Sequence, residues 1–144
     1  MCENRQMMSR RLARENAFSV VFESRFHKDA AVLDIYETAM AVREFEDDPY
    51  IRAVVLGVAE HKDELDGLIE KFSHGWKRNR ISPVSLSIME IAVYEMLYCE
   101  DIPYAVSINE ALELVKTYDE ENARAFVNGI LNAVSKEIGA KNEG

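Results

Sequence analysis

The 144-residue sequence has little cysteine and no long apolar run. Cys2 and Cys99 are its two cysteines, and their wide separation is not the pattern of a disulfide framework. The first residues, MCENRQMMSRR, lack the apolar stretch of a secretory signal peptide, and no segment approaches the roughly 20 apolar residues of a membrane-spanning helix. We therefore expect a cytoplasmic protein with reduced thiols and no membrane contact.

Motifs of catalysis and metal binding are also missing. The sequence contains no glycine-rich phosphate loop, no HExxH, no CxxC and no nucleophile elbow. Its histidines, His27, His61 and His74, are scattered, which favours surface residues over metal ligands. The sequence therefore predicts no enzyme, no cofactor and no metal site.

Positive charge is scarce, and the net charge of −9 argues at first against a nucleic-acid partner. The charge is unevenly placed, however, because Arg5, Arg10, Arg11 and Arg14 face only Glu3 in the first fourteen residues. Charges more than about 8 Å apart are largely screened at physiological salt. A local basic patch can therefore act within an acidic protein.

The apolar segment Pro83–Cys99 is the predicted centre of the fold. Its length and its Leu, Met and Ala residues favour a helix over a buried strand, and Pro83 suits a first helical position. Four residues form its one polar strip: Ser87, Glu90, Tyr94 and Tyr98. We expect this strip to reach the surface. Glu95 lies off the strip and should be partly buried, with an arginine or a backbone amide as its partner.

Apolar residues at helical spacing predict further helices on both sides of this segment. The predicted helices cover residues 10–26, 30–42, 48–72, 107–118 and 122–138, with 48–72 being either two helices or one that is kinked near His61. The inward positions of the second are Ala31, Ile35, Ala39 and Val42.

Local signals mark several details of these helices. Asp48 before Pro49 is a helix start, and Ser107 with Glu110 is a capping-box pattern. Gly129 interrupts an apolar stripe, which indicates close approach of another helix or a ligand. The segment WKRNRIS, residues 76–82, is a predicted loop with a second basic cluster.

The arginines at the start of the first predicted helix allow two interpretations. Arg10, Arg11 and Arg14 fall within an arc of about 100° and could act on one ligand together, or they could form a solvated charged turn. Arginine near a helix N-terminus is on the unfavourable side of the helix dipole, which slightly favours a functional reason.

Four segments in this order and at these separations carry a resemblance: SRRLARENA, IAVYE, DIPYAVSINEALELVK and FVNGIL. They closely resemble the NusB family of bacterial transcription antitermination factors, from about Ser9 to Val134. The resemblance implies an all-α fold, a bundle of about seven helices in two packed helical subdomains. It also implies one NusB-like domain over residues 1–144, with flexible ends at about 1–8 and 139–144.

The same resemblance implies an RNA-binding adaptor. Members of this family bind the single-stranded boxA sequence of ribosomal RNA leaders together with NusE, a protein of the small ribosomal subunit, within the antitermination complex of RNA polymerase. Some form homodimers that hide the RNA surface. Carried over position by position, the resemblance places seven residues on or beside the RNA: Arg10, Arg11, Arg14, Phe22, Tyr118, Asn122 and Phe126.

The sequence departs from the family pattern at three positions. Glu90 stands where relatives often have an RNA-contacting arginine, Phe22 stands where some have tyrosine, and Asp119 stands where glycine is common. A carboxylate at residue 90 would repel phosphate. The alternative hypothesis is therefore a dimeric protein-interaction module with weak or no RNA binding. An enzyme is a third class, because a similar helical domain precedes the catalytic part of some ribosomal RNA cytosine methyltransferases, but this chain ends at Gly144 without a cofactor-binding domain.

Overall fold

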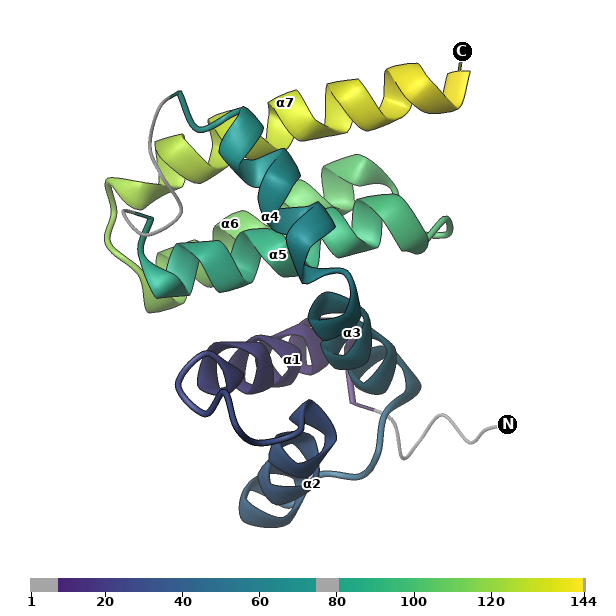
Figure 1. Cartoon of the computed structure of the whole chain (residues 1–144), viewed down its shortest axis with the longest axis vertical. Helices are drawn as coiled ribbons and strands as arrows, with labels where there is room; N and C mark the ends of the chain where they lie inside the picture. The colour runs from purple at the N-terminus through teal and green to yellow at the C-terminus, as the bar shows by residue number, and fades with distance from the viewer. Residues whose placement is uncertain (1–7, 75–80, 144) are drawn as a thin grey trace. The chain divides into compact units, whose positions relative to one another are not determined.

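The computed structural model describes residues 8–74 and 81–143 of the chain. These residues contain seven α-helices and no strand. They are α1 (Arg10–Ser24), α2 (Val32–Arg43), α3 (Pro49–Glu60), α4 (Lys62–Lys71), α5 (Pro83–Tyr98), α6 (Tyr104–Tyr118) and α7 (Ala123–Glu143) (Figure 1). The helices divide into two compact units at Ala59, so that α1 to α3 form the first and α4 to α7 the second. The predicted all-α fold is confirmed. None of the described helices is long and apolar enough to span a bilayer.

Residues 75–80 and the first seven residues lie outside the described part. The predicted basic cluster of Lys77, Arg78 and Arg80 therefore lies outside it, as do Cys2 and Arg5.

The first unit begins with a capped helix. The Ser9 hydroxyl accepts a hydrogen bond from the Leu12 amide at 3.1 Å and satisfies a donor that the start of α1 would otherwise leave open. The inner face of α1 includes Ala13, Ala17 and Val20, all buried, and α1 packs against α2.

The inward face of α2 differs from the prediction. Ile35 is buried as expected, but Ala31 and Val42 are exposed, and the fully buried residue is Tyr36. The Tyr36 ring can be buried because its hydroxyl donates a hydrogen bond to Asp47 Oδ1 at 2.6 Å. That partner lies in the loop after α2, and the apolar period of α2 alone does not reveal it.

The predicted helix start at Asp48 is confirmed. Asp48 Oδ1 accepts hydrogen bonds from the amides of Tyr50 at 2.8 Å and Ile51 at 3.1 Å, so the carboxylate caps α3. Because α3 ends at Glu60 and α4 begins at Lys62, the segment 48–72 forms two helices.

In the second unit α5 is the central helix, as predicted. It packs against α4, α6 and α7 (Figure 1). The polar strip of α5, however, does not all reach the surface: Ser87 and Glu90 are fully buried, whereas Tyr98 is exposed. Glu90 tolerates burial because Lys62 Nζ on α4 lies 3.0 Å from its Oε2 atom.

Helix α6 begins at Tyr104, three residues before the predicted start, so the capping box at Ser107 is wrong. The Ser107 side chain instead donates a hydrogen bond to Glu95 Oε1 at 2.7 Å, which gives the buried carboxylate of α5 a hydroxyl partner. Helix α7 continues to Glu143, beyond the predicted end at residue 138. A Cβ atom added to Gly129 would meet nothing within 4 Å, so the predicted close approach of another helix at this glycine is wrong.

Candidate nucleic-acid interface

The arginines at the start of α1 differ in exposure. Arg10 and Arg11 are exposed, whereas Arg14 retains only 5% of its accessible surface. The guanidinium carbons of Arg10 and Arg14 lie 4.5 and 5.7 Å from the centroid of the Tyr50 ring. A cation over an aromatic face is attracted by the ring's negative π-face, so Tyr50 orients both guanidinium groups.

Tyr50 is held in turn by the start of α3. Its amide donates to Asp48 Oδ1, and the same carboxylate oxygen caps Ile51. The position of Arg10 therefore depends on two local features, the Ser9 cap of α1 and the Asp48 cap of α3. The sequence indicated the helix start at Asp48 but not the Tyr50 ring that contacts the arginines.

Two other arginines of the first unit bond to polar side chains of that unit. Arg43 donates to Asn16 Oδ1 at 3.0 Å and to the Ser19 hydroxyl. Arg52 Nη2 lies 3.1 Å from Asp47 Oδ2. These contacts give Arg43 and Arg52 structural roles within the unit.

Phe22 belongs to a row of rings along α1. Its centroid lies 5.7 Å from that of Phe18 and 5.1 Å from that of Phe26. Phe22 is partly buried, and Phe26 at the end of the row is 59% exposed. Phe26 was not predicted as a binding residue, although the predicted helix 10–26 would place it on one face with Phe22. In the structure α1 ends at Ser24, so Phe26 lies just beyond the helix.

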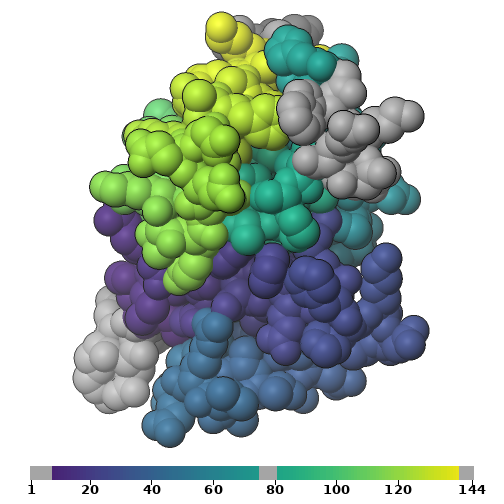
Figure 2. Space-filling model, turned by 90° about the vertical axis from the view of Figure 1, so that its left-hand side faces the viewer, coloured from purple at the N-terminus to yellow at the C-terminus, as the bar shows by residue number. Residues whose placement is uncertain are grey.

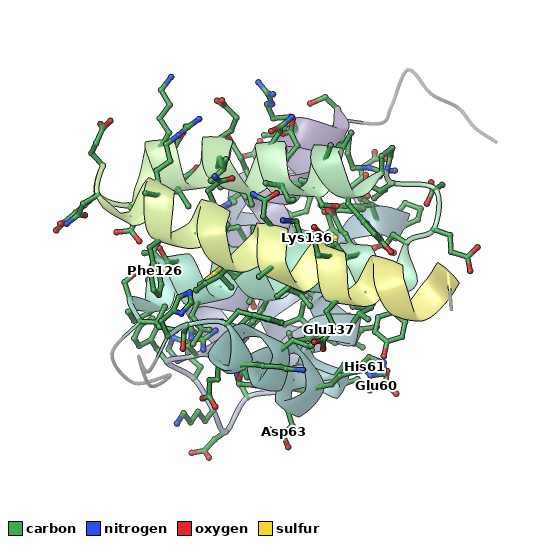
Figure 3. The ribbon with its side chains drawn as sticks, turned by 90° about the horizontal axis from the view of Figure 1, so that it is seen from above. Glu60, His61, Asp63, Phe126, Lys136 and Glu137 are labelled. Carbon is green, nitrogen blue, oxygen red and sulfur yellow. The ribbon has the colours of Figure 1, made fainter. Side chains whose placement is uncertain are left out.

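The second unit carries a cavity of about 370 Å³ where the α6–α7 turn meets the start of α5. It is lined by Ile81, Ser82, Ser85, Asp119, Glu120, Asn122, Ala123 and Phe126. The face in Figure 2 shows the start of α7, in yellow-green, beside the start of α5, in teal-green. Phe126 lies near the beginning of α7, far along that helix from Lys136 and Glu137 (Figure 3).

The seven predicted site residues thus fall into two groups. The first unit holds Arg10, Arg11, Arg14 and Phe22, and the second holds Tyr118, Asn122 and Phe126. Asn122 and Phe126 share the cavity, and Tyr118 is 44% exposed at the end of α6. Within the described residues, no group of three His, Cys, Asp or Glu side chains could hold a metal ion.

The family model described as NusB family matches residues 11–136 of the chain. The chain belongs to the NusB family. The transcription antitermination protein NusB of Acetivibrio thermocellus is 45% identical over 130 residues, which are 90% of each chain. T. maritima NusB superposes with a TM-score of 0.84 at 33% identity, over 90% of this chain and 92% of that one.

A third likeness concerns the fold. The crystal structure of the antitermination factors NusB and NusE in complex with double-stranded RNA contains a chain with a TM-score of 0.80 at 24% identity. The match covers 89% of this chain and 96% of that one. Both are all-helical proteins of the same architecture.

Membership of the NusB family makes this chain a transcription antitermination factor and confirms that it is not an enzyme.

The structure also changes the interpretation of Glu90. The family resemblance suggested that this carboxylate would face RNA phosphate in place of an arginine. Glu90 is instead fully buried and bonded to Lys62 of the same unit. Its carboxylate is therefore not presented on the surface of the NusB fold, so Glu90 no longer argues against RNA binding.

Proposed function

We propose that this NusB-family factor binds boxA-type single-stranded RNA of ribosomal RNA leaders together with NusE, and acts as an adaptor in the RNA polymerase antitermination complex. The observation that carries the proposal is the exposed pair Arg10 and Arg11 at the start of α1, with Arg10 stacked on Tyr50. A guanidinium group offers phosphate a planar fork of donors and can stack on bases. The solved complex of a NusB of the same fold with NusE and RNA supports both partners.

The cavity of the second unit supports the same proposal. Unpaired bases bind by stacking on aromatic rings and by hydrogen bonds to their edges. Phe126 supplies a partly exposed ring and Asn122 an amide on one cavity. We propose that the RNA strand contacts this cavity, Tyr118 and Phe22 in addition to the arginines.

The double variant Arg10→Ala with Arg11→Ala tests the proposal. Each phosphate contact on a single strand contributes about 0.7 to the slope of log affinity against log salt, so two lost contacts should flatten the slope by about 1.4. Affinity for labelled boxA RNA, measured by anisotropy with NusE present, should fall at least tenfold. Arg14 is left out of this variant because it is buried, and its loss would affect folding as well as binding.

The matched control is Lys28→Ala with Lys136→Ala, which removes the same two charges at exposed positions of the two units. The control should keep the wild-type salt slope. Equal slopes for the Arg10/Arg11 variant and the wild type would exclude the arginines from the interface. Absence of boxA binding by the wild type, with and without NusE, would instead favour the dimeric protein-interaction module.

A further inference from the structure

A single carboxylate joins the α6–α7 turn to the first turn of α5. Asp119 is the C-cap residue that follows α6, and its amide donates to the Val115 carbonyl at 2.8 Å. Its Oδ2 atom accepts hydrogen bonds from the hydroxyls of Ser82 at 2.7 Å and Ser85 at 2.6 Å. Its Oδ1 atom accepts one from the Glu120 amide at 2.7 Å. Both oxygens are therefore engaged, one across to α5 and one within the turn.

The partners of Asp119 on α5 are well suited to hold an anion. Ser82 is the N-cap of α5, and its hydroxyl oxygen accepts from the Ser85 amide at 3.0 Å while donating to Asp119. A negative charge at a helix N-terminus is stabilised by the helix dipole and by the open amide donors of the first turn. The carboxylate thus completes the cap of α5 from a segment more than thirty residues further along the chain.

The turn held by Asp119 leads directly into the residues that line the cavity. The Ala123 amide donates to the Glu120 carbonyl at 3.0 Å and the Arg124 amide to the Glu121 carbonyl at 3.2 Å, so the chain enters α7 within four residues of Asp119. Asn122 and Phe126 follow in this short stretch and line the same cavity as Ser82 and Asp119. Because this connection between Asp119 and α7 is short, the position of Asp119 determines where the side chains of Asn122 and Phe126 lie.

We propose that Asp119 is a positioning residue for RNA, which fixes the α6–α7 turn on the first turn of α5 and so presents Asn122 and Phe126 to an unpaired base. The inference rests on the proposed function. Asp119 does not bind phosphate itself, because a carboxylate offers no donor and carries the same sign of charge. Its oxygens instead accept three hydrogen bonds within the unit.

Binding of labelled boxA RNA with NusE separates this role from a simple charge effect. Asp119→Ala removes a negative charge, which would strengthen binding to a polyanion if charge alone mattered. Loss of the Asp119 hydrogen bonds should instead weaken binding, and we expect a loss of about fivefold to tenfold, the size of one net hydrogen bond. Asp119→Asn keeps an acceptor for the serine hydroxyls and should bind within twofold of the wild type.

Two further variants complete the experiment. Ser85→Ala keeps the charge and removes one hydrogen bond, so it should also weaken binding, by about threefold to tenfold. Asp101→Ala, at an exposed position between α5 and α6, removes a charge away from the cavity and should leave the affinity within twofold. Wild-type or tighter binding by both Asp119→Ala and Ser85→Ala would overturn the proposal.

Hydrogen exchange of the Ala123 and Arg124 amides gives a readout that does not need RNA. Faster exchange in Asp119→Ala and Ser85→Ala than in the wild type and Asp101→Ala supports the positioning role. Unchanged exchange in both variants would overturn it. If the turn loosens as expected while the wild type binds no RNA, the proposed function fails and the structural part of this inference stands.

Discussion

Two buried acids of the second unit share one lysine. Lys62 Nζ lies 3.0 Å from Glu90 Oε2 and 3.5 Å from Asp66 Oδ2. The Glu90 and Asp66 side chains are 0% and 1% exposed, whereas that of Lys62 is 45% exposed. Replacing Lys62 should therefore destabilise the unit through the carboxylates that remain.

The expected loss of stability in Lys62→Met follows from the burial of the two carboxylates and the partial exposure of the lysine. Removing one partner of a buried ion pair costs about 3–5 kcal/mol, because the other charge is left uncompensated. Lys62 is half exposed, so water can reach part of the site, and we expect the lower end, about 3 kcal/mol. For a chain of this length each kcal/mol corresponds to about 2–4 °C in Tm. The Tm should thus fall by about 6–12 °C.

Urea and thermal unfolding, followed by circular dichroism at pH 7, measure this cost. Lys116→Met on the exposed face of α6 is the matched control and should change the free energy of unfolding by less than about 0.5 kcal/mol. The double variant Lys62→Met with Glu90→Gln also removes one of the two buried negative charges and should be more stable than Lys62→Met alone. A Lys62→Met protein within 0.5 kcal/mol of the wild type would refute the reasoning.

Three further predictions concern stability. Arg14→Ala should lower the free energy of unfolding by about 1–3 kcal/mol, because its guanidinium is buried beside Tyr50, whereas Arg10→Ala should change it by less than about 0.5 kcal/mol in urea titrations. Ser107→Ala should cost about 1–3 kcal/mol, since it removes a hydroxyl donor from the buried Glu95 carboxylate, and a change below 0.3 kcal/mol would contradict this. Burial and the hydrogen bond to Asp47 raise the pKa of Tyr36 to about 12.

The sign of the Tyr36 effect follows from that pKa. Between about pH 10 and 12 the Tyr36 phenol stays neutral in the folded protein, whereas in the unfolded chain the same phenol ionises near pH 10. The contribution of Tyr36 to the free energy of unfolding is therefore complete below about pH 10 and is lost as the pH rises to about 12. The loss should amount to about 2–3 kcal/mol. Unfolding measured from pH 8 to 12 should show a shallower decline in Tyr36→Phe than in the wild type. Parallel declines would contradict the assignment.

The helices were predictable because their signals are local. Asp48 caps α3 as the sequence indicates, and the apolar content of Pro83–Cys99 made that segment central. Predictions from local patterns failed where a side chain forms a hydrogen bond with a residue that is distant in the sequence. Ser107 fits a capping-box pattern, but its hydroxyl donates a hydrogen bond to Glu95 on another helix.

In the candidate site, too, local features were predictable and long-range contacts were not. Helical periodicity grouped Arg10, Arg11 and Arg14, but it could not show that Arg14 is buried or that Tyr50 on α3 orients it. The burial of Glu90 was hidden because its counter-charge lies 28 residues earlier in the chain.

The bonds from Asp119 to α5 were equally inaccessible to sequence reasoning. Neither Ser82 nor Ser85 carries any sign of a partner more than thirty residues away. Contacts of this kind depend on how helices pack, and a single sequence reports that only indirectly.

The central claim is that the protein presents guanidinium groups and nearby rings to an unpaired RNA strand, with NusE as its partner. Titration of labelled boxA RNA with this protein, in the presence and absence of purified NusE, tests it most directly. We expect NusE to tighten binding, and we expect affinity to fall as salt rises, with a slope near −3 if about four phosphates are contacted. Affinity that neither NusE nor salt changes, or no binding in either titration, would contradict it.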